Sequence, residues 1–304
     1  MKVAKFLAVA LAVLVVAGVA LWASPFGRSL RGAMGLIEPV YDTEAPEWPA
    51  GFGEPDSVSV LVFSKTNGFR HAEAIPAAEE RVREIAARRG WRVFATENGA
   101  VFEEGRLAQV DVVVGNNCTG DNWSPAQKQA FRRWVEGGGA FVGVHGAGGT
   151  RHAYWDWYQK TLIGAGYLGH PMGPQFQRAT LRVENPDHPA TRHLEPEWEF
   201  TDEWYSFLSN PRARGANVLV TLDESTYSPR MKMLGRDDDL SMGPDHPIVW
   251  SHCLGEGRAF FSALGHRAEA YSDPRYARMI EGALVWAAGL EGDCSYPLAP
   301  AEGD

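Results

Sequence analysis

The residues of this chain best suited to chemistry are histidines that stand directly after predicted strands. The stretch GGGAFVGVHGAGG spans residues 137–149, and His145 stands where its buried apolar run, Ala140–Val144, ends. His71 and His266 follow two other predicted strands in the same manner. Because ligands of open α/β sheets bind outside the carboxyl ends of the strands, we expect these histidines to line one pocket.

Acidic and polar side chains join the histidines at these strand ends. Asp202 and Glu203 are adjacent, so on a strand they point to opposite faces, and we expect Glu203 to be the inward one. We predict that His145, Glu203 and His71 are catalytic, because imidazole and carboxylate groups can exchange protons with a bound substrate. The predicted substrate-binding residues are Asn67, Arg70, Asn117, Asp202, Trp204 and Tyr205.

Two kinds of chemistry remain open at this predicted site. A divalent metal such as zinc needs three or four imidazole, carboxylate or thiolate ligands, and Glu203 is one candidate. The candidate metal-binding histidines are His71, His145, His170 and His266. Their spacings are long and no HExxH motif is present, so metal-free acid–base catalysis on a sugar is the alternative. For a glycosidase-type carboxylate pair, Asp121 and Asp156 are both candidate partners.

Composition narrows the class of partner. The chain has 304 residues, 45% hydrophobic and 22% charged, which suits one large domain or two small ones. Its formal net charge of −9 argues against nucleic acid, which requires a basic surface. The glycines of residues 137–149 do not match GxGxxG, so no nucleotide cofactor is expected. The expected partner is a small-molecule sugar, with a few of the 11 tryptophans lining its pocket and the others packed in the core.

The start of the chain predicts a membrane segment. Lys2 and Lys5 precede an apolar stretch without charge, residues 6–23, at the short end of the length that spans a bilayer. We expect an uncleaved anchor with the domain outside the cytoplasm, periplasmic or extracellular. A cleaved signal peptide and a secreted domain are the alternative, and Arg28 and Arg31 beyond the stretch weaken the argument for orientation.

The cysteines and two repeated triplets give weaker signals. Cys118, Cys253 and Cys294 are widely spaced, which permits one disulfide and one free thiol and provides no CxxC zinc motif. The triplet Asp-His-Pro occurs at residues 187–189 and 245–247, each time before a predicted strand, and turn chemistry accounts for both.

The order of predicted elements indicates an α/β fold. Strands and helices alternate in the first half, which predicts a doubly wound, mostly parallel sheet flanked by helices. The second half adds further strands with little helix between them. The predicted strands are residues 57–63, 91–95, 110–114, 140–144, 175–183, 199–207, 217–222, 248–250 and 258–264. The predicted helices are residues 72–89, 124–136, 155–163 and 274–288.

An ordered series of blocks makes the chain resemble the ThuA family, named for trehalose utilisation. The blocks are VLVFSKTNGFRH (60–71), GWRVFATENG (90–99), VDVVVGNNCTGDNWSPAQKQAF (110–131), GGGAFVGVHGAGG (137–149), WDWYQKTLIGAGYLGHP (155–171), DHPAT (187–191), DEWY (202–205) and the run 245–266, which includes DHPIVW and GEGRAFFSALGH. The resemblance implies a fold similar to the class I glutamine amidotransferases. It divides the chain into an anchor or signal segment (1–23), a Pro- and Gly-rich linker or irregular arm (24–54), a ThuA-like domain (55–290) and a tail (291–304).

The resemblance also sets expectations for function. In class I amidotransferases the strand-ending motif is Gly-x-Cys-x-Gly, with cysteine as the nucleophile; here the matching residues are Gly143-Val144-His145-Gly146-Ala147. Glutamine hydrolysis through a thioester is therefore excluded. The family name implies a carbohydrate substrate, such as a trehalose-like disaccharide or a keto-sugar derivative, with hydrolytic or lyase-type chemistry. The alternatives are a non-catalytic sugar-binding module and a metal-dependent hydrolase of another small substrate.

Overall fold

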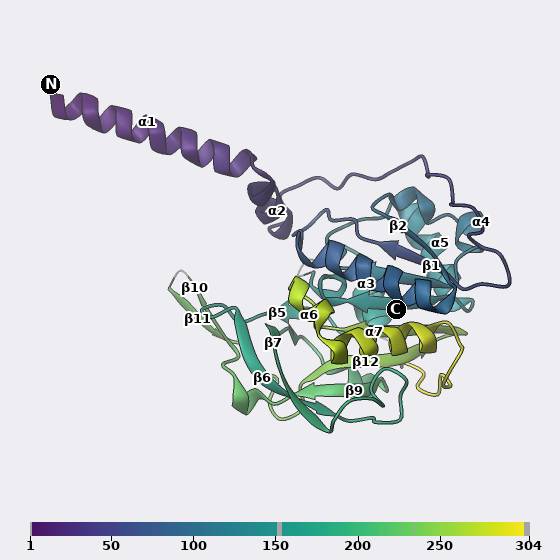
Figure 1. Cartoon of the computed structure of the whole chain (residues 1–304). Coiled ribbons are helices and arrows are strands. Elements are labelled where there is room, and N and C mark those ends of the chain that lie inside the picture. Colours follow the sequence, from purple (N-terminus) through teal and green to yellow (C-terminus); the bar gives the residue numbers. More distant parts are fainter. Residues whose placement is uncertain (1, 151–153, 234, 301–304) are drawn as a thin grey trace.

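A nine-stranded mixed sheet runs through the folded body and carries the carboxyl ends at which the histidines lie (Figure 1). The computed structural model describes residues 2–150, 154–233 and 235–300. The strand order is β2-β1-β3-β4-β13-β12-β9-β6-β7. Strands β2, β1, β3, β4 and β13 are parallel to one another, whereas the pairs β13–β12, β12–β9, β9–β6 and β6–β7 are antiparallel. The predicted α/β class with a flanked sheet is confirmed.

The parallel strands are short and apolar because helices cover both of their faces. In four of these five strands, β1, β3, β4 and β13, all or nearly all residues are buried. Only the edge strand β2 is partly exposed. The bounds are β1 Ser59–Phe63, β2 Arg92–Thr96, β3 Val112–Asn116, β4 Ala140–Val144 and β13 Gly257–Ser262.

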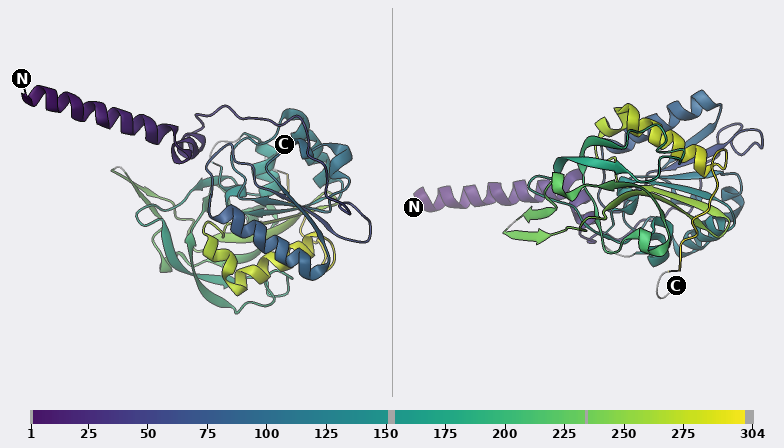
Figure 2. Two further views of the ribbon diagram at one scale, coloured as in Figure 1. Left: turned by 45° about the horizontal axis from the view of Figure 1, so that its top comes forward. Right: turned by 90° about the horizontal axis from the view of Figure 1, so that it is seen from below.

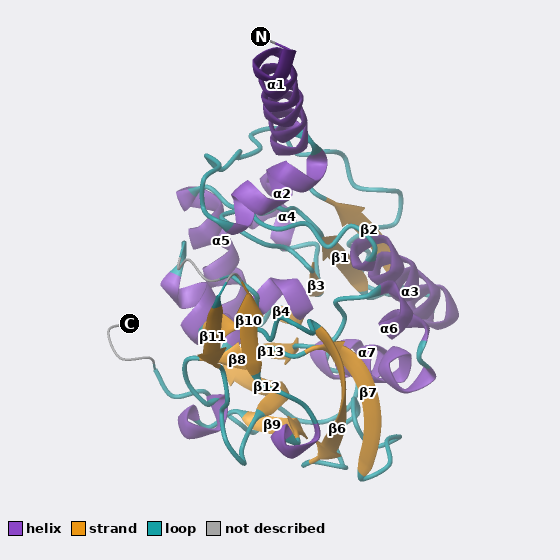
Figure 3. Cartoon of the chain, turned by 90° about the vertical axis from the view of Figure 1, so that its left-hand side faces the viewer, coloured by secondary structure: helices purple, strands orange, loops and turns teal. Residues whose placement is uncertain are grey.

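Helices are packed on the two faces of this sheet. Figure 3 shows α3 (Ala74–Arg89), α6 (Ala268–Ser272) and α7 (Pro274–Ala287) on one side, with α4 (Glu104–Leu107) and α5 (Pro125–Glu136) on the other. α3 ends at Gly90 with a φ of 70°, the left-handed conformation that glycine adopts without strain. α5 begins with a capping box, in which Ser124 and Gln127 satisfy each other's backbone N–H groups.

The second half departs from the predicted boundaries in two strands. Residues 199–207 were expected as one strand, but the chain turns at Trp204 and Tyr205, so that β7 stays in the main sheet while β8 joins a separate pair with β5. The strand expected at 248–250 extends over eight residues as β12. The bounds are β5 Tyr167–Gly169, β6 Phe176–Val183, β7 Glu197–Glu203, β8 Ser206–Phe207, β9 Asn217–Leu222 and β12 Pro247–Leu254.

Shorter elements fill the connections. The predicted helix 155–163 is a π-helix, η3 (Trp157–Ile163), so its helical turns start two residues later than expected. A hairpin that the sequence analysis did not predict, β10 (Arg230–Met233) and β11 (Arg236–Asp239), projects from the body. The single-turn helices are η1 Gly99–Val101, η2 His145–Gly148, η4 Pro211–Arg214 and η5 Glu224–Thr226.

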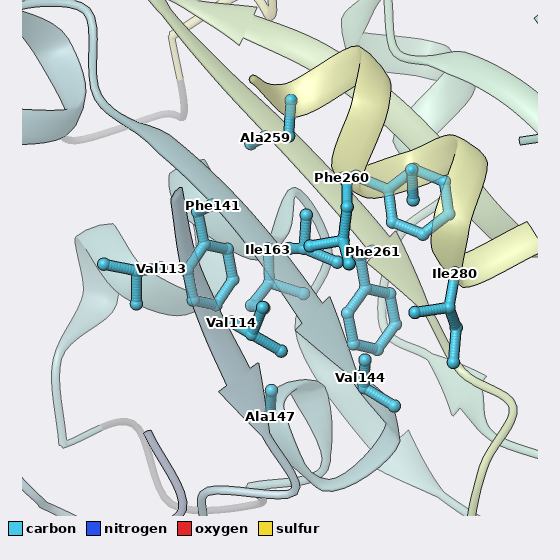
Figure 4. Close-up of a cluster of buried hydrophobic side chains, with 14 of the residues drawn as sticks. Val113, Val114, Phe141, Val144, Ala147, Ile163, Ala259, Phe260, Phe261 and Ile280 are labelled. Atoms are coloured by element: carbon cyan, nitrogen blue, oxygen red, sulfur yellow. The ribbon is translucent and has the colours of Figure 1, made fainter. Parts of the chain in front are cut away.

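The core lies between the sheet and its helices. Phe141, Phe260 and Phe261 are almost fully buried, and Figure 4 shows them among Val113, Val144 and other apolar side chains of neighbouring strands. Burial of side chains of this size supplies most of the favourable folding free energy. The rigid strands place the loops that follow them, and therefore the histidines at their ends.

The segment before the sheet begins with two helices and then lies against the domain. α1 (Lys2–Ala23) projects away from the body in Figures 1 and 2, and α2 (Pro25–Ala33) forms within the stretch expected to be irregular, because Ser24 caps it and Pro25 opens it. The following residues are attached to the domain: Lys65 and Asp42 form an ion pair, and Trp48 packs against Phe94 of β2.

The described residues contain no single helix that is both long and apolar enough to cross a membrane. One bent pair, Leu11–Ala23 with Pro25–Gly32, meets the requirements of length and composition together.

The tail returns to the domain. Cys294 forms a disulfide with Cys253 at the end of β12, and Cys118 is free and buried. The backbone N–H of Cys253 donates to the carbonyl of Tyr296 at 2.9 Å. The cysteines thus adopt one of the arrangements that their number permits.

Two buried histidines distant from the predicted site predict sensitivity to acid. Burial lowers the pKa of both His188 and His252 to about 4, from an ordinary 6.5. Between pH 6.5 and 4 the unfolded chain therefore binds more protons than the folded one, and we expect the free energy of unfolding to fall as the pH falls through this window, by about 3 kcal/mol per histidine. Urea unfolding at pH 7 and pH 4.5 measures the difference. His252→Gln, which keeps a donor for the carbonyl of Thr161, should reduce this difference by the share of one histidine. Equal unfolding free energies at both pH values in the unmodified protein would contradict the expectation.

Candidate functional site

His145 occupies a strained turn directly after β4. Its φ is 43°, in the left-handed region that residues other than glycine rarely adopt. Asn117, after the neighbouring strand β3, has a φ of 50°, and its side-chain oxygen accepts the backbone N–H of Gly146. A side chain at Gly146 would collide with the ring of His71, since a Cβ there would lie 2.9 Å from His71 Cε1. The turn is therefore built to bring His145 and His71 together.

Four side chains converge at this turn. His71, His145, His266 and Glu203 each offer a ligand atom, and these atoms all lie within 4.8 Å of one another. His145 Nε2 is 3.0 Å from His266 Nδ1 and 3.3 Å from Glu203 Oε2, and His266 Nδ1 is 3.1 Å from the same carboxylate oxygen. The histidines come from the ends of β1, β4 and β13, and Glu203 is the last residue of β7. The structure thus brings together the three residues predicted to be catalytic.

Hydrogen bonds fix the tautomer of His145. Its Nδ1 lies 2.7 Å from the carbonyl oxygen of Ala263, which can only accept, so Nδ1 carries the proton. Nε2 is consequently the nitrogen that faces the cluster. A ring held through Nδ1–H by a backbone carbonyl is the arrangement by which proteins orient a histidine that binds metal.

The two adjacent carboxylates have different tasks. Burial would raise the pKa of Glu203, but hydrogen bonds from His145 and His266 and the proximity of His170 hold that pKa well below its usual range. Burial raises the pKa of Asp202. Asp202 accepts the backbone N–H groups of Gly265 at 2.7 Å, Glu203 at 2.9 Å and His266 at 3.3 Å. Asp202 therefore supports the loop that carries His266, while Glu203 faces the imidazole rings.

The donor set fits a divalent transition-metal ion. Burial lowers the pKa of His71 well below its usual range, and the nearby His145 and His266 add to this effect, so the ring is neutral and able to bind a metal. Its Nδ1 is buried, and none of the described residues is a hydrogen-bond partner for it. Three imidazoles and one carboxylate are a ligand set that zinc and related ions accept. Of the four histidines predicted as metal ligands, three lie in the cluster with Glu203.

His170 lies on the outer side of the carboxylate. Its Nδ1 is 3.1 Å from Glu203 Oε1, whereas the rings of His145 and His266 approach Oε2. The side chain of His170 is 26% exposed, in contrast to the fully buried His145. Of these side chains, His170 is therefore the one most accessible to solvent.

Two aromatic rings that the sequence analysis did not single out flank His266. Phe69 lies 6.5 Å and Phe176 lies 5.0 Å from the His266 ring, measured between ring centroids, and both phenylalanines are half-buried. Arg267 extends over the Phe176 ring at 5.3 Å. Phe69 stands two residues before His71 and Phe176 is the second residue of the predicted strand 175–183, but neither position carried a sequence signal for a site.

The remaining predicted substrate-binding residues lie in different surroundings. Asn67 donates to the carbonyls of Val40 and Asp121, and Arg70 pairs with Glu97 on the surface. Their role in binding substrate stays a prediction.

Asn117, Trp204 and Tyr205 are almost fully buried. Asn117 donates to the hydroxyl of Tyr271, and Trp204 donates to the carbonyl of Gln177. The ring of Tyr205 is packed against His145, with centroids 4.3 Å apart and planes inclined by 30°. Burial raises the pKa of Tyr205 well above its usual range, so its hydroxyl stays protonated. These contacts indicate that Asn117, Trp204 and Tyr205 position neighbouring groups of the site. Their predicted contacts with a substrate stay a prediction.

The buried imidazole of His246 supports Tyr205, which in turn packs against His145. His246 is fully buried, with Nδ1 2.8 Å from Glu224 Oε1 and Nε2 2.8 Å from the carbonyl of Tyr205. Both partners accept, so both nitrogens donate and the ring is positively charged. Burial would raise the pKa of Glu224, but the hydrogen bonds from His246 and from the backbone of Met242 lower it. His246 belongs to the second Asp-His-Pro triplet, which turn chemistry alone does not explain.

Comparison with known proteins agrees with this fold and with the resemblance to the ThuA family. The family model for ThuA, described as trehalose utilisation, matches residues 59–287. A ThuA-like protein from Bacteroides uniformis, solved as a crystal structure, is 23% identical and has a TM-score of 0.62, with 79% of this chain and 95% of that chain covered. A second ThuA-like protein, from Parabacteroides merdae, is 18% identical and has a TM-score of 0.57, with 81% and 96% covered. At these identities the two structures are evidence of the fold alone. No curated protein matches the chain.

The matched region begins with β1 and ends with α7, so it includes every strand of the main sheet and all four residues of the cluster. The chain belongs to the ThuA family.

Proposed function

We propose that this protein is a divalent-metal-dependent enzyme that acts on a carbohydrate, with His71, His145, His266 and Glu203 as the metal ligands. The observation that carries the proposal is the approach of their four ligand atoms to within 4.8 Å of one another at the end of the sheet. A bound divalent ion would polarise a carbonyl or hydroxyl oxygen of the sugar or lower the pKa of water.

The protein's own residues orient the substrate and move protons. Ala263 and Asp202 fix the ring of His145 and the loop of His266 through the bonds described above. His170 contacts Glu203 through Nδ1, so its Nε2 is not used by this contact, and its side chain is partly exposed to solvent. We assign His170 Nε2 as the atom that gives a proton to, or takes one from, a sugar hydroxyl or leaving oxygen. Such transfer suits hydrolysis or elimination.

A carbohydrate substrate is supported by the description of the family and by two aromatic side chains beside His266. The half-buried rings of Phe69 and Phe176 offer apolar faces of the kind that pack against the C–H face of a pyranose. Gln175, the residue before Phe176, donates a hydrogen bond to Glu203. Its amide is therefore a polar group next to the Phe176 ring that a sugar hydroxyl could contact.

Phe176→Ala is expected to raise the KM for a sugar substrate about tenfold while leaving kcat within about threefold, because the ring contributes uniform binding and no chemistry. Steady-state kinetics on the sugar with the highest turnover measure both constants. Tyr296→Ala, at an exposed aromatic residue in the tail, is the matched control and should change neither constant. A fall in kcat with an unchanged KM would contradict this role for Phe176.

Export and anchoring form a second part of the proposal. α1 exposes its apolar side chains on all sides in the described part, among them Leu11, Leu14 and Val16, which favours insertion into a bilayer. The disulfide between Cys253 and Cys294 is of the kind that persists in oxidising compartments. We propose that α1 anchors the protein, with the domain outside the cytoplasm.

The test of the enzymatic proposal is turnover of trehalose-type disaccharides and their keto derivatives with and without added divalent metal. Product formation that disappears with chelator and returns with one metal supports the proposal. A sugar that raises the thermal stability of the metal-loaded protein without any product would show a binding module instead.

A further inference from the structure

α2 forms an elbow with α1 that side chains hold in place. The two helices are bent by 67° at residue 24. The guanidinium of Arg31 donates to the carbonyl of Trp22, the end of α1, and lies 5.1 Å from the centroid of the Trp22 ring. The backbone N–H of Ser24 donates to the carbonyl of Leu21 at 3.2 Å. These contacts fix the angle between α1 and α2.

One face of α2 is fixed to the domain beside the candidate site. The hydroxyl of Ser29 accepts the backbone N–H of Arg70 at 2.7 Å. At Gly32 the backbones approach so closely that a Cβ would lie 2.5 Å from the carbonyl oxygen of Gly68. Gly68 and Arg70 belong to the loop after β1 that ends at His71. Because α2 is bonded to this loop, its Ser29 and Gly32 face is covered by the domain, and only its other face can contact lipid.

The other face of α2 and the turn after it are apolar and exposed. Phe26 is 61% exposed, Leu30 42% and Met34 53%, and Leu36 and Val40 continue the patch. Exposed apolar side chains are ordinary when scattered, but these follow one another beside a helix that is apolar on all sides. Arg28 is exposed among them, and residues 24–37 contain no acidic residue in a chain of net charge −9; the exposed Glu38 follows, between Leu36 and Val40.

We infer that α2 lies in the interfacial layer of a bilayer containing anionic lipids and holds the His71 edge of the candidate site next to the membrane surface. The inference rests on the proposed anchoring by α1. If α1 follows the bilayer normal, the bend of 67° brings α2 closer to the membrane plane than to the normal. Phenylalanine and leucine on one face with arginine beside them are typical of interfacial helices, and tryptophan at the junction is typical of the headgroup level.

The views of the molecule agree with this placement. In Figures 1 and 2 the β10–β11 hairpin projects from the same side of the body as α1. The hairpin is connected to the loop after His170, since the backbone N–H of Met172 donates to the carbonyl of Arg230. The loops of His71 and His170 are therefore both on the side that faces the bilayer.

The test uses the full chain with single added cysteines carrying an environment-sensitive fluorophore. The native cysteines do not interfere, because two form a disulfide and burial raises the pKa of the Cys118 thiol to about 12. The probe replaces Leu30 in one variant (Leu30→Cys). The matched control is Leu290→Cys, 52% exposed just beyond α7. The chain around it is bonded to Arg258 at the start of β13, so it lies at the amino ends of the strands, away from the histidines.

Both labelled proteins are reconstituted in phosphatidylcholine vesicles with and without phosphatidylglycerol, and quenched by lipids with a nitroxide at the headgroup or in the acyl chain. We expect several-fold stronger quenching at residue 30 than at 290, strongest with anionic lipid and reduced by Arg28→Glu. Equal quenching at both positions in protein that floats with the vesicles would overturn the inference and leave the anchor intact. Failure to float with the vesicles would overturn both. Neither outcome depends on metal or on turnover.

Discussion

His145→Ala is expected to abolish stoichiometric metal binding and to lower kcat/KM for the sugar substrate by more than about 100-fold. Loss of a group that only supports a ligand costs about 10- to 100-fold, and His145 directs its own Nε2 into the cluster, so the loss should exceed that range. Elemental analysis of protein purified without chelator gives the metal content, and kinetics give the rate.

His193→Ala is the control for this substitution. His193 is a partly buried histidine whose Nε2 donates to the carbonyl of Arg275, away from the cluster. We expect its removal to leave both metal content and rate unchanged. Retention of a full equivalent of metal in His145→Ala would show that the cluster is not the binding site.

His246→Ala is expected to lower the free energy of unfolding by about 3 kcal/mol or more. Removal of one partner of a buried ion pair leaves the other charge without compensation, which costs about 3–5 kcal/mol. Here Glu224, only 11% exposed in its side chain, would lose its partner, and the carbonyl of Tyr205 would lose its donor. Urea unfolding monitored by tryptophan fluorescence measures the change. Because Tyr205 packs against His145, we also expect weaker metal binding in a folded sample of this variant.

Tyr227→Phe is the control that tests whether the ion pair, and not a neighbouring contact, causes the loss of stability. The Tyr227 hydroxyl lies 3.4 Å from His246 Nδ1, so this change keeps both charges and removes only a weak contact. We expect a loss below about 1 kcal/mol. If His246→Ala were no more destabilising than Tyr227→Phe, His246 would not be a charged, supporting residue.

The first half of the fold could be predicted because its strands carry their own signals. Val112, Val113 and Val114 form an uninterrupted apolar run, as expected for a parallel strand covered on both faces. The break between β7 and β8 could not be predicted, because Trp204 and Tyr205 have strand-forming side chains. The turn there depends on the distant His246, which fixes the Tyr205 carbonyl, and on pairing of β8 with β5.

The candidate site could be predicted in its residues but not in its arrangement. Histidines after β1, β4 and β13 indicated a common edge, since neighbouring parallel strands end together. The separation of His170 from the other three histidines depends on which oxygen of Glu203 each ring approaches, and no spacing encodes that. Phe69 and Phe176 were missed because single aromatic residues near strands are usually core residues.

The central claim is that one divalent ion is bound by His71, His145, His266 and Glu203. Anomalous diffraction from crystals of the metal-loaded protein, recorded on both sides of the absorption edge of the bound element, tests it most directly. We predict one strong anomalous peak at about 2.0–2.2 Å from a nitrogen of each of the three histidines and from an oxygen of Glu203. An ordered water among the four side chains, with no anomalous peak there in protein loaded with any divalent transition metal, would contradict the claim.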